Sequence, residues 1–226
     1  GFISPVTLLG KLIFRDARDG KLAWDTPLPA DLERRWSAWV EELPAHTALP
    51  RSLAAFSEPI IHIDLHGFGD ASDGDTAAAI YAVVYEAQGH YQALLASRAR
   101  LSKKMLTTPR LELVAAHMTA NLLHNVRMAA PDLPIRNVIG WTDSVVALHW
   151  VRASGNYKQY VRNRVAKIRD RADISWQHVP GEENPSDVAS NGATNHNLTD
   201  LWWLPQKDLW PSDFQTVPSD ELETEA

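Results

Sequence analysis

Four carboxylates lie in settings that suggest a shared site: Asp70 in HGFGDAS, Glu112 in PRLELVAAH, Asp143 in IGWTDSVVALHW and Asp187 in HVPGEENPSDVAS. The first follows a predicted strand, the second lies near the start of a predicted helix, the third ends a strand and the fourth opens a helix after a turn. If these elements pack together, the four acids converge. Because clustered carboxylates repel one another, such a group usually binds a pair of hard divalent cations through its oxygens.

Each acid also has a structural explanation. Asp70 could be a turn residue, and Glu112 lies in the first turn of its predicted helix, where the helix dipole favours acids. Asp143 and Asp187 each precede or open a helix, a place where aspartate often serves as the N-cap. The order Asp-Glu-Asp-Asp therefore carries more information than any one of the four.

Length and composition limit the class of protein. The chain has 226 residues, of which 45% are hydrophobic, enough for one substantial domain with appendages. No apolar stretch approaches 18 residues and the N-terminus has no secretory pattern, so we expect neither a membrane span nor a signal peptide. The absence of cysteine excludes disulfides and thiolate zinc sites, and it fits an intracellular chain.

Charge is unevenly distributed along the chain. The net charge of −6 argues weakly against nucleic-acid binding. However, residues 152–171 carry seven basic residues and one acid, Asp170, whereas the stretch after Trp210 is acidic. An acidic tail therefore masks a basic middle segment.

Hydrophobic periodicity predicts the elements that must position these residues. Residues 8–17 and 31–43 have helical spacing, and Asp31 is a candidate cap for the second helix. Asp73 and Asp75 fall in the polar run SDGD and are expected to be hairpin or loop acids. The remaining elements are predicted as strands at 59–70, 77–87 and 90–99, a helix at 109–130, a strand at 135–143, helices at 144–153 and 157–172, a strand at 173–179, and a helix from 185 that Gly192 ends early.

This order predicts an α/β fold with a mixed five-stranded sheet, in which three antiparallel strands are followed by parallel additions, flanked by helices. The acid order, and the strings HGFGDAS, TTPRLELVAA, WTDSVVALHW, YVRNRVAKI and HVPGEENPSDVAS, resemble the ribonuclease H region of BEL/Pao-class retrotransposon polyproteins, within the type 1 ribonuclease H family. The segments GFISPVTLLGKLIF and LWWLPQKDLWP resemble the flanks of that region. The resemblance thus covers nearly the whole chain.

The resemblance implies a division of the chain and a set of catalytic residues. Residues 1–55 would be a helical appendage from the end of the reverse transcriptase connection region, 58–195 the ribonuclease H-like domain, and 196–226 a tryptophan-containing acidic tail. The four acids would hold two Mg²⁺ ions, with Mn²⁺ as the alternative, and Asp70 would be shared by both. His178 would assist proton transfer or product release, although a lone histidine at a strand end is often structural.

The implied activity is hydrolysis of the RNA strand of RNA–DNA hybrids during reverse transcription. The implied partners are the hybrid and the reverse transcriptase and integrase parts of the same polyprotein, with no membrane, in a cytoplasmic retroelement particle. Two rivals remain: a catalytically silent domain that binds nucleic acid or acts as a scaffold, and an integrase-like strand transferase. The second is disfavoured because such enzymes place the glutamate last, whereas here it is the second acid.

Nucleic-acid contacts are expected from two places. Lys158, Arg162 and Arg164 lie on the basic helix and suit phosphate binding, although an ordinary solvated helix face would look the same. Thr108 and Arg110 end the loop 102–110, where hydroxyls and a helix N-terminus also suit phosphates.

Overall fold

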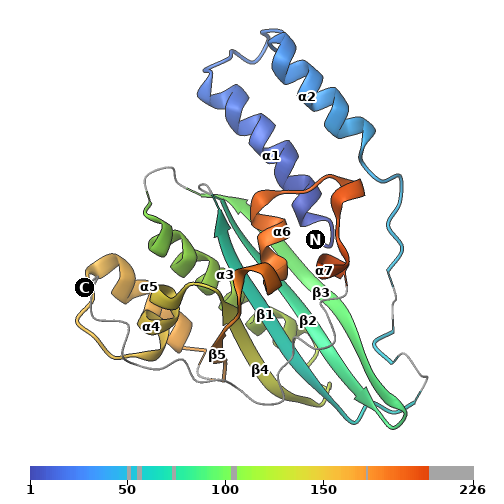
Figure 1. Cartoon of the computed structure of the whole chain (residues 1–226), viewed down its shortest axis with the longest axis vertical. Helices are drawn as coiled ribbons and strands as arrows, with labels where there is room; N and C mark the ends of the chain where they lie inside the picture. The colour runs from blue at the N-terminus through green and yellow to red at the C-terminus, as the bar shows by residue number, and fades with distance from the viewer. Residues whose placement is uncertain (50–51, 55–57, 73–74, 103–105, 172, 204–226) are drawn as a thin grey trace.

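The protein is described by a computed structural model that covers residues 1–49, 52–54, 58–72, 75–102, 106–171 and 173–203 (Figure 1). Its strands are β1 (His62–Ser72), β2 (Asp75–Glu86), β3 (Gly89–Leu101), β4 (Ile135–Thr142) and β5 (Ser175–His178). Its α-helices are α1 (Ser4–Asp19), α2 (Ala30–Glu41), α3 (Thr108–Ala129), α4 (Val145–Arg152), α5 (Gln159–Arg169), α6 (Pro185–Asn191) and α7 (Asp200–Trp203).

The five strands form one mixed sheet in the order β3-β2-β1-β4-β5. The pairs β1–β2 and β2–β3 are antiparallel, whereas β4 is parallel to β1 and β5 is parallel to β4. Connections between the parallel strands run through helices, as crossovers require. The predicted α/β fold class and the predicted sheet plan are confirmed.

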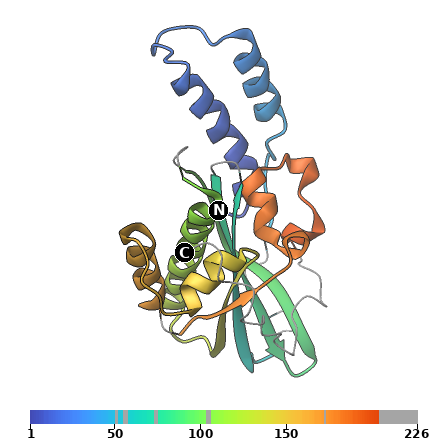
Figure 2. The same cartoon turned by 60° about the vertical axis from the view of Figure 1, so that its left-hand side comes forward.

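Helices cover both faces of the sheet. In Figure 2, α3, α4 and α5 lie on one side, and α6 lies on the other. Gly67 and Gly69 of β1 face α3, and a Cβ atom at Gly69 would lie 2.6 Å from the Thr119 side chain and 3.1 Å from the Ala115 backbone. The Thr119 hydroxyl donates a hydrogen bond to the Phe68 carbonyl at 3.1 Å. Glycine therefore permits the close approach of α3 to β1.

The opposite face of β1 packs against α6. Phe68 lies there in a buried cluster with Tyr81, Trp141 and Ala189. Strand side chains alternate between faces, so Asp70 points to the same side as Phe68. Helix α6 ends at Gly192, as predicted, with φ of 76°, a left-handed conformation that favours glycine.

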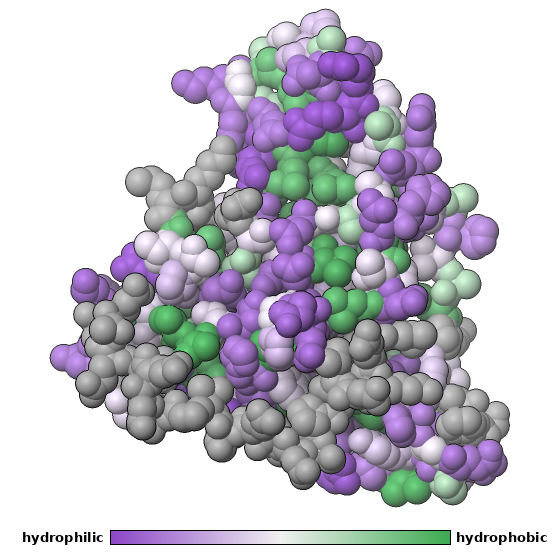
Figure 3. Space-filling model, viewed as in Figure 1, coloured by the Kyte–Doolittle hydropathy of each residue, from purple (hydrophilic) through white to green (hydrophobic). Residues whose placement is uncertain are grey.

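The two helices predicted near the N-terminus are α1 and α2, and they form a hairpin that extends from the sheet (Figure 1). Trp39 packs against Gly10 and donates a hydrogen bond to the Val6 carbonyl at 2.9 Å. Phe14 and Trp36 are exposed, and Figure 3 shows hydrophobic surface on the hairpin among hydrophilic residues. The capping prediction was wrong: Pro29 is the N-cap, and Asp31 lies in the first turn.

Asp75 lies at the predicted hairpin, opposite Ser72 in the β1–β2 pair. It begins β2, is 4% exposed and pairs with Arg15 of α1 at 2.9 Å, so it is a buried ion-pair partner rather than a solvated loop acid. Because Arg15 comes from a distant segment, local polarity gave no sign of this pairing. Asp73 lies outside the described residues.

The start of the predicted tail packs on the sheet. Trp202 is fully buried; it donates a hydrogen bond to the Phe2 carbonyl at 2.9 Å, and its own carbonyl accepts one from Tyr81 at 2.7 Å. The rest of the tail, from residue 204, lies outside the described residues. The three-part division of the chain remains a prediction. Among the described residues, no helix is both long enough and apolar enough to cross a membrane.

Gly69→Ala tests the contact between α3 and β1. The new methyl group would meet the Ala115 backbone as well as Thr119, so α3 must move, and we expect a loss of about 2–4 kcal/mol in unfolding free energy. Urea denaturation monitored by circular dichroism measures this loss. Gly20→Ala, where the new methyl has ordinary contacts, is the matched control and should change stability by less than about 1 kcal/mol. Equal effects of the two variants would contradict the close-approach argument.

Candidate active site

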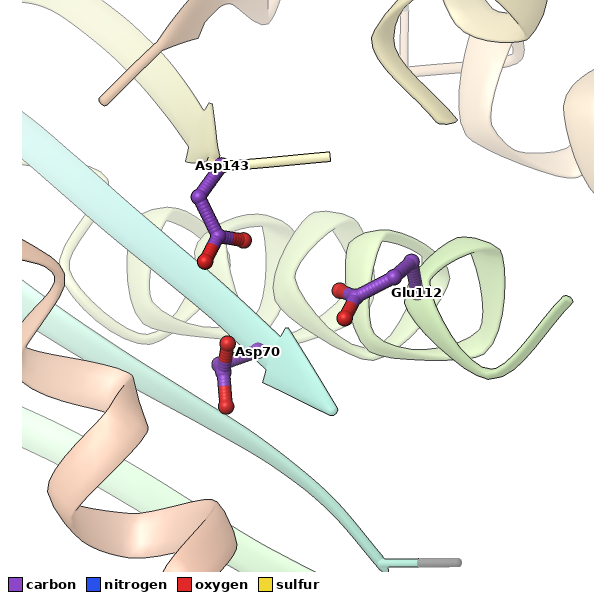
Figure 4. A group of neighbouring side chains, drawn as sticks. All are labelled: Asp70, Glu112 and Asp143. Atoms are coloured by element: carbon purple, nitrogen blue, oxygen red, sulfur yellow. The ribbon is translucent and has the colours of Figure 1, made fainter. Parts of the chain in front are cut away.

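Three of the four predicted carboxylates converge at one end of the sheet. Asp70, Glu112 and Asp143 each offer an oxygen such that all three atoms lie within 4.8 Å of one another. Figure 4 shows the three side chains pointing toward one another from β1, α3 and the end of β4. Since β1 and β4 are adjacent parallel strands, their carboxyl ends bring Asp70 and Asp143 to the same edge of the sheet.

Asp70 is held from the α6 side. It is 4% exposed, and the Ser190 hydroxyl donates a hydrogen bond to its Oδ2 atom. Ser190 is itself buried on the helix that covers this face. The side chain of Asp70 therefore has a fixed orientation in the absence of any ligand.

Glu112 comes from α3. The helix begins at Thr108, one residue earlier than predicted, so Glu112 is in the second turn and not in the first. The helix dipole acts mainly on the first turn, so it does not account for this acid. Glu112 is 7% exposed and lies beside the small residues Ala115 and Ala116, which are buried against the sheet. The close packing of α3 on β1 thus brings Glu112 to Asp70.

Asp143 follows β4 and is half-buried. It is not the N-cap of α4, because Ser144 fills that position and accepts a hydrogen bond from the Ala147 amide at 3.2 Å. His178, at the end of β5, contacts the same residue: its Nε2 atom lies 3.2 Å from the Asp143 carbonyl oxygen. His178 therefore lies next to the three carboxylates, and its contact is with the backbone carbonyl of Asp143.

Asp187 lies nearby, outside the group of three. It is exposed in the first turn of α6, and its Oδ1 atom accepts a hydrogen bond from Asn191 at 2.8 Å. It is not the N-cap, because Asn184 fills that position. Its charge nevertheless raises the pKa of both Asp70 and Asp143. The carboxylate is thus close enough to act on the site electrostatically.

Burial and mutual repulsion perturb all three converging acids. Burial raises the pKa of Glu112 to about 9, helped by the charges of Asp70 and Asp143. Burial also raises the pKa of Asp70 to about 6, against the lowering effect of the hydrogen bond from Ser190. The pKa of Asp143 is raised mainly by burial, and the charge of His178 opposes the shift. The group therefore resists full ionisation unless positive charge is supplied.

Two oxygens of this group are buried and lack a hydrogen-bond partner among the described residues: Glu112 Oε2 and Asp143 Oδ1. Buried polar atoms are nearly always paired, so each marks a place for an unrecorded ligand. All the available donors are carboxylate oxygens, which hard cations such as Mg²⁺ prefer. The residues present therefore fit a divalent-metal site.

Sequence reasoning missed two supporting residues. Asn184 is fully buried, caps α6 through the Ser186 amide and donates to the Gly69 carbonyl at 3.1 Å, directly before Asp70. Ser190 holds the Asp70 carboxylate. The Asn184-Pro185 pair is a recognisable helix-start signal. Nothing in the local sequence indicates the contact between Ser190 and Asp70, which depends on how α6 packs on β1.

Two of the predicted nucleic-acid residues form a cationic surface between the start of α3 and α5, centred on Tyr160. The guanidinium carbons of Arg110 and Arg164 lie 5.3 Å and 3.6 Å from the Tyr160 ring centroid, so α5 and the start of α3 are joined there. Lys158, Arg162 and Thr108 are exposed on the same two segments. Of the loop before α3, Lys103 and Lys104 lie outside the described residues.

Other basic residues of this segment divide into two groups. Lys167, Arg164 and Arg171 act together to lower the pKa of His117 on α3, after the larger effect of burial, so their charges gather on the side of α5 that faces α3. Arg169 instead donates hydrogen bonds to the carbonyls of Val151, Trp150 and Ala153 at the end of α4. Arg169 is therefore a packing residue.

Comparison with known proteins identifies a family. The family model described as "Pao retrotransposon-like RNaseH-like domain" matches residues 1–144, which include all three converging acids but neither His178 nor Asp187. A comparison with curated protein sequences gave no match.

Solved structures similar to this chain include several ribonucleases H. RNase H1 of Halobacterium salinarum NRC-1 is 17% identical with a TM-score of 0.36, over 55% of this chain and 90% of that chain. The N-terminal RNase H domain of rv2228c from Mycobacterium tuberculosis, fused to maltose-binding protein, is 14% identical with a TM-score of 0.37, over 59% and 95%. The protease–reverse transcriptase of Prototype Foamy Virus is 16% identical with a TM-score of 0.36, over 69% and 25%.

Glu112→Gln tests whether the raised pKa reflects a metal site. Because the pKa of Glu112 is about 9 in the folded protein and 4.5 for an ordinary glutamate, the metal-free protein should lose stability as pH rises from about 5 to 9. We expect the variant to be roughly 2–4 kcal/mol more stable than the parent at pH 8 without metal. Mg²⁺ should raise the melting temperature of the parent by several degrees and that of the variant by much less.

Differential scanning calorimetry with EDTA or with Mg²⁺, at pH 5 and pH 8, measures both effects. Glu41→Gln, at an exposed position on α2, is the matched control and should follow the parent. An equal response to Mg²⁺ in the parent and in Glu112→Gln would contradict the assignment of Glu112 as a ligand.

Proposed function

Because this chain belongs to the Pao retrotransposon-like RNaseH-like domain family, we propose that it is a metal-dependent endonuclease that hydrolyses the RNA strand of RNA–DNA hybrids during reverse transcription. The observation that carries this proposal is the convergence of three carboxylates, two buried and one half-buried, two of whose oxygens have no hydrogen-bond partner among the described residues. Such a group is unfavourable unless cations are bound to it. The activity would be exercised within a polyprotein that also contains reverse transcriptase and integrase parts.

Asp70, Glu112 and Asp143 would hold one Mg²⁺ or Mn²⁺ ion, and Asp70 with Asp187 would hold the second. When bound, such a pair of ions supplies activation of the attacking water and stabilisation of the leaving 3′-oxygen in an in-line displacement. Asp70 would be shared because it lies on β1, close to Glu112 of α3 and in contact with Ser190 of α6. Asp187 would complete the second set from α6, where Asn191 already fixes its side chain.

Neighbouring residues would keep the carboxylates in place. Ser190 fixes one oxygen of Asp70, and Asn184 fixes the backbone just before it. His178 would move a proton to or from the reacting groups, or help product leave, from its position beside the Asp143 backbone. These residues would limit reorganisation at the moment of reaction.

Substrate binding would use the cationic surface between α3 and α5. Arg110 and Arg164, stacked on Tyr160, and the exposed Lys158, Arg162 and Thr108 would contact backbone phosphates. The surface would make binding sensitive to salt. The alternative function is a catalytically silent domain that binds nucleic acid or acts as a scaffold. All four acids are retained in this chain, which favours the enzyme.

Asp143→Asn tests the activity. The substitution keeps the size of the side chain but removes a charge that would bind metal, so we expect cleavage of a labelled RNA–DNA hybrid in Mg²⁺ to fall at least about a thousandfold. Asp132→Asn, at an exposed acid outside the helices and strands, should cleave like the parent. Single-stranded RNA and duplex DNA should remain intact. Parent protein that binds hybrid in Mg²⁺ or Mn²⁺ without cutting it would support the silent alternative.

Arg164→Ala tests the cationic surface. Loss of one phosphate contact should raise KM for the hybrid roughly three- to tenfold, with little change in kcat, and should make KM less dependent on salt. Arg34→Ala, which removes an exposed charge from α2, is the control. Steady-state kinetics at two KCl concentrations separate the two effects. Identical salt dependence in the parent and Arg164→Ala would remove Arg164 from the binding surface.

A further inference from the structure

A second polar groove lies at the edge of the sheet, between α1 and the edge strand β3. Its volume is about 420 Å³, and its polar lining includes Ser4, Thr7, Lys11, Arg98 and Arg100. No acidic residue lines it among the described residues. The proposed function uses none of these side chains.

The cations of the groove are brought together by a direct contact between α1 and β3. The Lys11 ammonium donates a hydrogen bond to the Ala99 carbonyl at 2.7 Å, which leaves its other two hydrogens available. Ala99 is flanked by Arg98 and Arg100, both exposed. Because these two arginines are two residues apart on a strand, they point to the same face. Ser4 is held in place by a hydrogen bond to Ser97 at 2.8 Å.

The positive charge here is not neutralised by the part of the chain that the structure describes. Arg15, Arg35, Arg127 and Arg136 each pair with an aspartate, whereas no ion pair involves Lys11 or either arginine of the groove. The pKa of Lys11 is lowered by partial burial and by the charge of Arg98. A bound anion would relieve this repulsion, and serine and threonine hydroxyls are suitable additional donors.

Sheet register relates the groove to the carboxylates. Ala99 lies opposite Ala77 of β2, and Ala77 lies opposite Asp70 of β1. Two strand spacings separate Ala99 from Asp70, a distance of about 10 Å. The groove and the carboxylates therefore lie two strands apart at the same level of the sheet.

The strand register also shows to which face of the sheet the Arg98 side chain points. Arg98 lies opposite Ala78, and Ala78 lies opposite Gly69, whose open face is covered by α3. Arg98 therefore points to the side from which α3 delivers Glu112. A duplex that enters the carboxylate site from that side would bring its backbone to the groove.

We infer that the groove formed by Lys11, Arg98 and Arg100 binds backbone phosphates of the RNA–DNA hybrid, away from the bond that is cut. This inference rests on the proposed function. It makes α1 part of the substrate-binding surface, so that the segment before the sheet contributes to affinity as well as to packing. A hybrid too short to reach the groove would bind more weakly than a longer one.

Position-specific neutralisation of the substrate tests the inference. A series of hybrids is made, each with one uncharged methylphosphonate linkage at a different position. Their equilibrium binding is measured with Mg²⁺ and the full chain carrying Asp143→Asn, which serves as the background protein. In that background, neutralisation of at least one linkage away from the cleavage position should weaken binding roughly threefold or more. Adding Arg98→Gln and Arg100→Gln should weaken binding of the unmodified hybrid roughly tenfold and reduce the salt slope by about two.

In this double variant, neutralisation at the same position should have no further effect, because the partner of that phosphate is already gone. Lys11→Gln is a second variant with a smaller effect in the same direction. Lys21→Gln with Arg34→Gln removes two exposed charges from the hairpin and is the matched control. Circular dichroism melting confirms that each variant is folded.

The outcomes separate the two proposals. If the Asp143→Asn protein shows no preference for the hybrid over duplex DNA, both the proposed function and the inference about the groove are overturned. If the Asp143→Asn protein prefers the hybrid, but the neutral linkage weakens binding equally with and without Arg98→Gln and Arg100→Gln, only the inference about the groove is overturned. A double variant that instead binds the hybrid as before but loses binding of inorganic phosphate, measured by calorimetry, would assign the groove to a free anion. That result would also overturn the inference.

Discussion

Mutual repulsion among buried carboxylates is the constraint on which this structure depends. Asp70 and Glu112 are almost fully buried, and Asp143 is half-buried beside them, so ionising all three without a counter-charge is unfavourable. A core selected for stability alone would replace such residues with apolar ones. The rest of the fold must therefore hold them together against their own electrostatic energy, and it does so with packing and hydrogen bonds.

Three separate contacts supply that rigidity. The sheet brings Asp70 and Asp143 to one edge through the parallel pairing of β1 and β4. Gly69 lets α3 lie close enough for Glu112 to reach them, and Thr119 fixes the helix to the Phe68 carbonyl. On the other face, α6 contributes Ser190 and Asn184. Because these contacts come from α3, α6 and two strands, the site is assembled only when the whole domain has folded.

Much of this fold could be predicted because its signals are local. Strand alternation, the apolar stripe of α3 and the turn residues before α6 give element types and approximate boundaries without tertiary information. The predictions failed where a contact with a distant segment of the chain determines the structure. Asp75 looks like a loop acid until Arg15 of α1 reaches it, and the position of Glu112 in its helix depends on a start that shifted by one residue. The contact between Ser190 and Asp70 spans most of the domain, and no local pattern encodes it.

The acidic net charge of the chain conceals an arrangement that suits a polyanionic ligand. Two cationic surfaces lie outside the carboxylate group, one formed by α5 with the start of α3 and the other by α1 with β3. Charge clusters of opposite sign at this spacing create local potentials that the net charge does not report. A phosphate backbone held on these two surfaces would be brought over the carboxylates even though their own charge repels it. Metal cations bound to the carboxylates would then attract the phosphates at the place where the carboxylates repel them most strongly. The same residues that make the metal-free site unfavourable would thus make substrate and metal binding mutually dependent.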